Sequence, residues 1–281
     1  MSAVPAGRPR KRGRYVLPTY TGIVMLYLAT PILVMIAFGF NDTKGRFNFT
    51  WQGFTLEWYR NLFAVPELTT ALRNSLTIAF VSTLLATVLG TMIALALARH
   101  RFRGKAGLDL VMFMNIAAPE VVLGASLLAL FVTAQIPRGF GTILVTHVMF
   151  TVSYVAVTIR ARLAGFDRSL EEAAQDLGAG PWIAFWKVTF PLIFPGILAG
   201  ALLAFALSID DYIITSFVAG QTATFPLWVY GATRLGIPPQ VNAMGTLIFL
   251  GGALLAVGNL LLQRRENRRE RADLLQRQAS A

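Results

Sequence analysis

The sequence predicts an all-α membrane protein that crosses a bilayer six times. Of its 281 residues, 55% are hydrophobic and only 14% are charged, and apolar runs long enough to span a bilayer recur along the chain. Its Lys and Arg residues sit between and beside these runs. A soluble nucleic-acid-binding protein spreads basic residues over a folded surface, so the net charge of +11 does not indicate a nucleic-acid partner.

Six apolar runs meet the length of roughly 20 residues that one crossing needs. A basic stretch, Arg8 to Arg14, precedes the first run, but that run is long and lacks a small-residue cleavage site, so we expect a retained helix and not a signal peptide. The expected helices lie near 16–40, 71–98, 107–133, 141–162, 191–217 and 241–262.

The predicted organisation is a basic tail at 1–15, one six-helix membrane domain at 16–262 and a charged segment at 263–281. Charges in this last segment recur at helical spacing, so we expect it to continue the sixth helix, and contact with membrane lipid headgroups is an open role for it. Most Lys and Arg residues lie at 8–14, 99–105, 160–187 and 264–277. Because basic loops stay cytoplasmic, we expect a multi-pass protein of the cell (inner, cytoplasmic) membrane with both termini in the cytoplasm.

Residues that carry enzyme chemistry are few. The chain has no cysteine, so it offers no disulfide, zinc cluster or thiol nucleophile, and its redox compartment is undetermined. His100 lies in a basic loop and His147 in a helix with no second ligand at i+4, so we assign no metal site. Spacing suggests no Ser-His-Asp group, and we expect no catalytic residue and no enzyme activity.

The stretch at 167–191 is too polar at its start to cross a membrane and too regular for a plain linker. One apolar face at i, i+3, i+4 and i+7 predicts a helix, made by Leu170, Ala173, Ala174 and Leu177. Three interpretations of the stretch at 167–191 are open: an amphipathic loop on the membrane surface, a DNA-binding helix-turn-helix, and a docking element for a soluble partner. No compact domain surrounds the stretch, which disfavours DNA.

Turn signals within the stretch divide it into two helices. Ser169 followed by Glu172 forms a capping-box pattern that starts the first helix. Gly178 and Gly180 tolerate the positive φ with which helices often end, and Pro181 can open a second short helix. We therefore expect two helices bent about a tight turn.

These residues also carry a family resemblance. Glu172-Ala173-Ala174, then Gly178, then Val188-Thr189-Phe190-Pro191 resembles the EAA loop of permease subunits in binding-protein-dependent ABC importers, with Phe190 where the family pattern has Leu. The resemblance implies a type I ABC importer permease fold whose loop inserts into a cleft of an ATPase subunit, with Glu172 contacting a basic group there. Implied partners are two ATPase copies, a second homologous permease and an extracytoplasmic solute-binding protein.

The chain itself lacks the G-x-x-x-x-G-K-[ST] phosphate loop, so another polypeptide must hydrolyse ATP. We expect no cofactor in this chain, with ATP and magnesium bound by the ATPase. From about Arg73 to Leu262 the chain looks like the spermidine/putrescine branch of the family, through RFRGK (101–105), GFD (165–167), EAAQDLGA (172–179), LSIDD (207–211), SFV-G (216–220) and VNA (241–243). That resemblance implies a polyamine substrate.

Three acidic residues fall within predicted spans: Glu120, Asp210 and Asp211. An intramembrane carboxylate usually faces a cavity or a partner, because burying it costs about 2.5–3.5 kcal/mol on insertion scales. Counting about 1.5 Å per residue along straight helices puts all three in the outer half of the membrane, where they would form a cation pathway. Tyr212 could add cation–π contacts. The alternative is an interhelical clamp with Arg73 or Arg234.

Two other functions stay open. The substrate could be a metal ion or an anion, although like charge on a carboxylate-lined path argues against anions. From a different class, the chain could be a non-transporting membrane scaffold or receptor.

Overall fold

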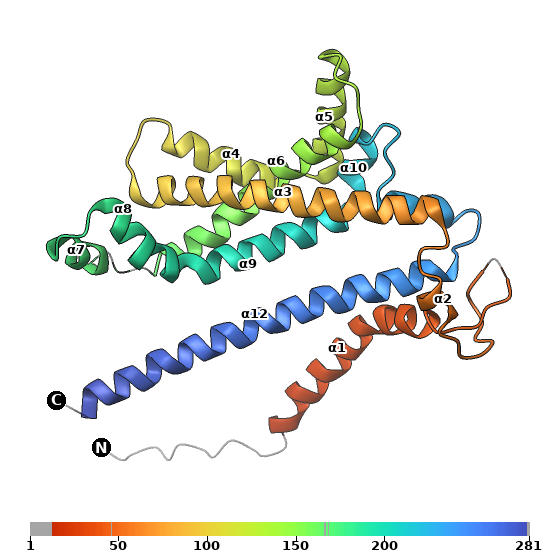
Figure 1. The fold of residues 1–281 in the computed structure, drawn as a ribbon, viewed down its shortest axis with the longest axis horizontal. Coiled ribbons are helices and arrows are strands. Elements are labelled where there is room, and N and C mark those ends of the chain that lie inside the picture. The colour runs from red at the N-terminus through yellow and green to blue at the C-terminus, as the bar shows by residue number, and fades with distance from the viewer. Residues whose placement is uncertain (1–12, 46, 166, 168, 280–281) are drawn as a thin grey trace, which may run out of the picture. The chain divides into compact units, whose positions relative to one another are not determined.

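The computed structural model of the protein describes residues 13–279 except 46, 166 and 168. The predicted basic tail at 1–15 therefore lies mostly outside the described residues. The described chain is helical, with one isolated bridge between Asn41 and Phe54. Its elements are α1 (Gly13–Phe38), α2 (Glu57–Arg60), α3 (Pro66–Arg99), α4 (Lys105–Ala117), α5 (Glu120–Thr133), α6 (Phe140–Leu163), α7 (Ser169–Asp176), α8 (Pro181–Ala184), the π-turn η1 (Phe185–Thr189), α9 (Phe190–Ile209), α10 (Ile213–Val218), α11 (Phe225–Ala232) and α12 (Pro239–Ala279), as labelled in Figure 1.

Five of these helical stretches are long and apolar enough to cross a membrane, and a bent pair supplies a sixth span if it is counted as one. The five are Tyr15–Phe38, Pro66–Arg99, Phe140–Leu163, Pro181–Ile209 and Pro239–Gly258, and the bent pair is Lys105–Ala117 with Glu120–Thr133. The predicted all-α membrane fold is confirmed.

The chain forms two compact units. One contains residues 1–62 and 236–248, and its centre is the buried Asn41. The Asn41 side-chain Nδ2 donates to Asn48 Oδ1 at 2.6 Å and to the Thr50 carbonyl at 2.7 Å, while Trp58 Nε1 donates to the Asn41 carbonyl at 2.7 Å. The polar segment after α1 is thus folded around one amide.

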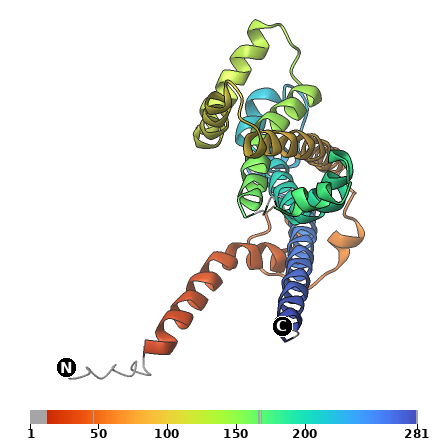
Figure 2. The same ribbon diagram turned by 90° about the vertical axis from the view of Figure 1, so that its left-hand side faces the viewer.

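The other unit contains residues 63–235 and 249–281, and its core is formed by α3, α6 and α9, which lie side by side in Figures 1 and 2. Small residues let these helices approach closely. A Cβ added to Gly90 would lie 2.8 Å from the Val155 Cβ, and one added to Gly196 would lie 2.9 Å from the Arg162 Cβ. Gly196, Gly200 and Ala204 form a buried stripe of small residues on α9, and the two glycines lie against α6.

Two predicted helices are not continuous. The span expected at 107–133 bends by 110° between α4 and α5, where the extended Ala118 precedes Pro119. Proline disfavours a helical conformation in the residue before it, which explains the break. The helix expected at 191–217 ends at Ile209, and α10 begins at Ile213 after a three-residue gap.

The expectation that the charged segment continues the sixth helix is confirmed as far as residue 279. The helix α12 runs without interruption from Pro239 to Ala279, so the charged segment continues it.

Candidate functional site

The loop at 167–191 begins with a side-chain cap. The α7 helix starts at Ser169, whose backbone N–H donates to Asp167 Oδ1 at 3.0 Å. This hydrogen bond to the charged form lowers the pKa of the exposed Asp167 carboxyl below its usual range. The capping oxygen therefore comes from Asp167, and the expected start with Ser169 as cap is displaced by two residues.

The turn that follows uses the glycines differently. Gly178 has φ +89°, the left-handed conformation that suits a helix end, whereas Gly180 is extended with φ −63°. Pro181 opens α8 as predicted. The second helix is not separate, however, because α8 passes through η1 directly into α9. The loop thus ends in the same helical run that spans the membrane.

Glu171 ties the loop to α3. Its Oε1 pairs with Arg99 Nη2 at the end of α3 and accepts a hydrogen bond from Thr189 Oγ1 in η1. Arg99 Nη2 also lies 3.2 Å from Thr189 Oγ1. The Glu171 and Arg99 side chains are only 16% and 21% exposed. This cluster links α7, η1 and α3, so the loop is tied to two of the helical stretches long enough to cross a membrane.

The next residue in the chain has the opposite placement. Glu172 is exposed, and so are Ala173, Gly178 and Pro191, while Ala174 is half-buried. Large apolar side chains surround them, with Leu177 90% and Trp182 72% exposed. Exposed apolar surface of this kind marks an interaction site, so the predicted docking residues lie on a surface that suits a partner.

The carboxylates predicted to form a pathway lie at the two helix breaks. Asp211 is buried, and its Oδ2 accepts the Thr215 N–H at 2.8 Å and the Thr215 Oγ1–H at 2.5 Å, while Oδ1 accepts the Ile214 N–H at 3.3 Å. These donors are in the first turn of α10, where N–H groups lack helical partners. Asp211 thereby starts α10.

His147 of α6 completes a buried polar chain around Asp211. Its Nε2 lies 2.9 Å from Thr215 Oγ1 and 3.4 Å from Asp211 Oδ2, and its Nδ1 lies 2.7 Å from Ser208 Oγ. Ser208 continues the chain to Ser82 of α3 at 3.0 Å. A neutral imidazole satisfies this chain if Nε2–H donates to Thr215 and Nδ1 accepts from Ser208. The chain connects α3, α6, α9 and α10.

Asp210 and Glu120 are placed differently from Asp211. Asp210 is exposed at the end of α9, and Glu120 is exposed as the first residue of α5. The straight-helix depth for Glu120 is wrong because the α4–α5 pair bends by 110°. The helix α5 packs against α10, where Gly124 lies against the Phe217 ring, so the break that carries Glu120 and the break that carries Asp210 and Asp211 adjoin packed helices. Two of the three carboxylates are exposed and one is buried.

Tyr212 lies in the second break. Its ring packs on Tyr230 of α11 with the centroids 4.6 Å apart. Among the described residues, neither Arg73 nor Arg234 forms an ion pair with any of the three acids, and the ionisable side chain beside Asp211 is that of His147. The alternative interpretation, an interhelical clamp with one of these arginines, is therefore not formed in this structure.

Sequence reasoning missed His147, Ser208 and Thr215 as a group. His147 and Ser208 lie 61 residues apart, so no local spacing joins them. One signal was available. Thr142, Thr146, His147, Thr151 and Ser153 are all buried in α6, which gives that span an unusually polar interior face.

Comparison with known proteins gives a consistent result. Residues 86–268 match the family described as "Binding-protein-dependent transport system inner membrane component". The spermidine/putrescine transport system permease protein PotC of Haemophilus influenzae is 39% identical over 246 residues, covering 87% of this chain and 95% of the relative. The putrescine transport system permease protein PotI of Escherichia coli is 41% identical over 256 residues, covering 87% of this chain and 90% of the relative.

Solved structures show the same fold at low identity. A bacterial ABC transporter involved in the import of the acidic polysaccharide alginate aligns with a TM-score of 0.63 at 17% identity, over 93% of this chain and 99% of the other. An amino acid ABC transporter with histidines aligns with a TM-score of 0.57 at 18% identity, over 75% and 99%.

Proposed function

Because the chain belongs to the family of inner-membrane components of binding-protein-dependent transport systems, we propose that it is the permease subunit through which such a system imports polyamines. The observation that carries the substrate class is the identity of 36–41% to spermidine/putrescine and putrescine permeases over about nine tenths of the chain. Spermidine and putrescine are linear cations with alkyl spacers. Carboxylates and aromatic rings along a path suit both parts of such a molecule.

Transport by this family depends on a binding protein, and the chain acts as the membrane-spanning component of the transport system. We propose the finer assembly as one copy of this chain, one homologous permease, two ATPase copies on the cytoplasmic side and a solute-binding protein outside. ATP and magnesium would then be bound by the ATPase. The distribution of Lys and Arg supports cytoplasmic termini.

The 167–191 loop is the coupling element in this proposal. Glu172, Ala173, Ala174 and Gly178 contact the ATPase, and Pro191 lies where the loop becomes the spanning helix. Closure of the ATPase dimer moves α7, and the Arg99–Glu171 pair and the unbroken α8–η1–α9 run carry that movement into α3 and α9. Both helices reach the buried chain through Ser82 and Ser208.

The carboxylates at the helix breaks have two different roles in this proposal. Exposed Asp210 and Glu120 contact the substrate's ammonium groups, and Tyr212 lies beside them in the path. Buried Asp211 holds the start of α10 and so keeps the second break in place. Discontinuous helices near binding sites are a common transporter device, because irregular backbone is tolerated where it lines a cavity.

Uptake of labelled spermidine and putrescine tests the proposal. Proteoliposomes that contain the complete importer and its binding protein should accumulate polyamine only with ATP, and the rate should fall when this chain is omitted. ATP-dependent accumulation of a divalent metal ion or an anion without polyamine uptake would reject the polyamine substrate. A scaffold would neither transport nor change the ATPase rate.

A further inference from the structure

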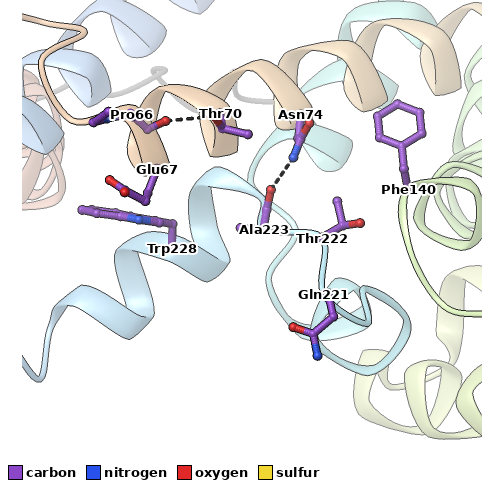
Figure 3. Close-up of a pocket in the computed structure, with 9 residues that line it drawn as sticks. All are labelled: Pro66, Glu67, Thr70, Asn74, Phe140, Gln221, Thr222, Ala223 and Trp228. Atoms are coloured by element: carbon purple, nitrogen blue, oxygen red, sulfur yellow. Dashed lines mark hydrogen bonds between the residues drawn. The ribbon is translucent and has the colours of Figure 1, made fainter.

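A second possible cation site lies apart from Glu120, Asp210 and Asp211. A pocket of about 590 Å³ is formed by the first turns of α3, the start of α6, the loop before α11 and α11 itself (Figure 3). Small-molecule pockets commonly have about 300–1,000 Å³. None of the three acids lines it; its lining residues are Pro66, Glu67, Thr70, Asn74, Phe140, Gln221, Thr222, Ala223 and Trp228.

Hydrogen bonds hold the two walls of this pocket together. Asn74 Nδ2 donates to the Ala223 carbonyl at 2.9 Å, and the Phe225 N–H donates to Ser75 Oγ at 2.8 Å. Both bonds join α3 to the segment that runs into α11. The pocket is therefore preformed, and a ligand would not have to order its walls.

The charge and shape of the lining suit an alkylammonium group. Glu67 is exposed, and within the described part of the chain no ion pair is recorded for its carboxylate. Figure 3 shows Glu67 and the Trp228 indole at the same end of the pocket. Trp has the ring that attracts cations most strongly. Among the described residues, no Lys or Arg lines the pocket, while Phe140 and Pro66 give apolar surface for methylene groups.

We propose that this pocket is an entry site that holds one terminal ammonium of a linear polyamine between Glu67 and Trp228 before the substrate reaches Asp210. The substrate's identity rests on the proposed function, whereas the preference for an alkylammonium rests on the pocket. The short helix α10 joins the pocket to Asp210 and Asp211 along the chain. Its loop, Gln221 to Ala223, follows α10, and α10 begins at the turn that Asp211 holds.

Glu67 also has a simpler role available. It lies in the first turn of α3, where a negative charge stabilises the helix through its dipole. That role would be sensitive to the charge of Glu67 but not to any ligand in the pocket. A test therefore has to measure, inside the pocket itself, both the binding of a ligand and the preference for positive charge.

The absence of cysteine in this chain permits such a test. Gln221→Cys places a single exposed thiol in the pocket of the assembled importer. We expect the ratio of the rates for an ethylammonium thiosulfonate and the anionic sulfonatoethyl reagent to be at least about fivefold higher here than for a free thiol, because Glu67 attracts one reagent and repels the other. This excess is the charge preference. Putrescine should slow the cationic reaction. Glu67→Gln should remove both the preference and the protection, and Trp228→Leu should weaken the protection.

Two controls make the result specific. Thr133→Cys places an exposed thiol on α5 outside the pocket and should show neither effect, and the unmodified chain accounts for labelling of partner subunits. A ratio of the two rates at Gln221→Cys equal to that for a free thiol, or no protection by putrescine in an importer that transports it, would overturn the entry site. A charge preference with putrescine protection in an importer that does not transport polyamine would overturn the proposed substrate and keep the alkylammonium site.

Discussion

The imidazole Nε2 of His147 lies 3.4 Å from Asp211 Oδ2, and both side chains are almost fully buried. They come from α6 and from the break between α9 and α10. The Thr215 hydroxyl bridges them, and the Ser208 hydroxyl bonds to the other imidazole nitrogen, Nδ1. Leaving a buried polar group without a hydrogen-bond partner costs stability. We therefore expect the loss of any side chain in this buried hydrogen-bond network to destabilise the fold.

Replacing His147 should destabilise the protein. In His147→Ala, Ser208 and Thr215 each lose one buried hydrogen bond, worth about 0.5–1.5 kcal/mol, while Ser208 keeps its bond to Ser82 and Thr215 its bond to Asp211. We expect a lower midpoint of thermal unfolding for the detergent-solubilised importer. His100→Ala is the matched control because His100 is exposed. Equal thermal unfolding midpoints for His147→Ala and the wild type would show that the buried hydrogen bonds of His147 do not stabilise the fold.

Neutralising the two adjacent aspartates should have different effects. Asp210→Asn removes an exposed charge, so uptake of polyamine should fall about tenfold or more, equivalent to about 1.4 kcal/mol, with assembly and thermal stability unchanged. Asp211→Asn should lower both uptake and stability because its carboxylate holds the start of α10. Radiolabelled uptake and unfolding midpoints measure these effects. Wild-type uptake by Asp210→Asn would remove it from the pathway.

Glu172→Lys should uncouple the ATPase from transport without changing membrane insertion. Glu172 is exposed on the loop, so reversing its charge disturbs a partner contact and leaves this chain intact. The ratio of ATP hydrolysed to polyamine transported, with co-purification of the ATPase, measures coupling.

Gln175→Lys adds positive charge at another exposed position of α7 and should couple normally. Normal transport by Glu172→Lys with the ATPase still bound would exclude the docking role.

Gly124→Ala should disturb the contact between α5 and α10. An added Cβ would lie 2.4 Å from Phe217 Cδ2, so the ring has to move, and overpacking of this kind costs about 1–3 kcal/mol. We expect a lower unfolding midpoint and slower uptake. Gly141→Ala has open space around its Cβ and should be neutral or slightly stabilising, since Ala favours helix. Equal unfolding midpoints and uptake rates for the two variants would show that the contact between α5 and α10 accommodates the extra methyl group without a cost in stability.

The spans and the loop followed from local patterns. Apolar runs gave the positions of α3, α6 and α12 to within a few residues because burial in lipid acts on each span separately. The EAA motif identified the 167–191 loop, and Gly178 with Pro181 gave the position of its turn, since backbone preferences depend on a few neighbours. The same reasoning placed Glu172 at the surface and found the three acids.

The roles of these residues depended on contacts between distant segments. Membership of Glu120, Asp210 and Asp211 in predicted spans was readable from the sequence. Pro119 marked a place where the third span could break, but the 110° bend there and the break at Asp210 were not readable, because an apolar run looks the same bent or straight. Asp211 became a buried capping group only when α6 brought His147 to it, and Glu171 became an internal partner only when α3 brought Arg99. By itself the sequence determined an all-α permease with five or six membrane spans and the position of its EAA loop. The tertiary structure decided which carboxylate is exposed and which is buried, because hydrogen bonds between residues 61 and 68 positions apart hold His147 beside the buried Asp211.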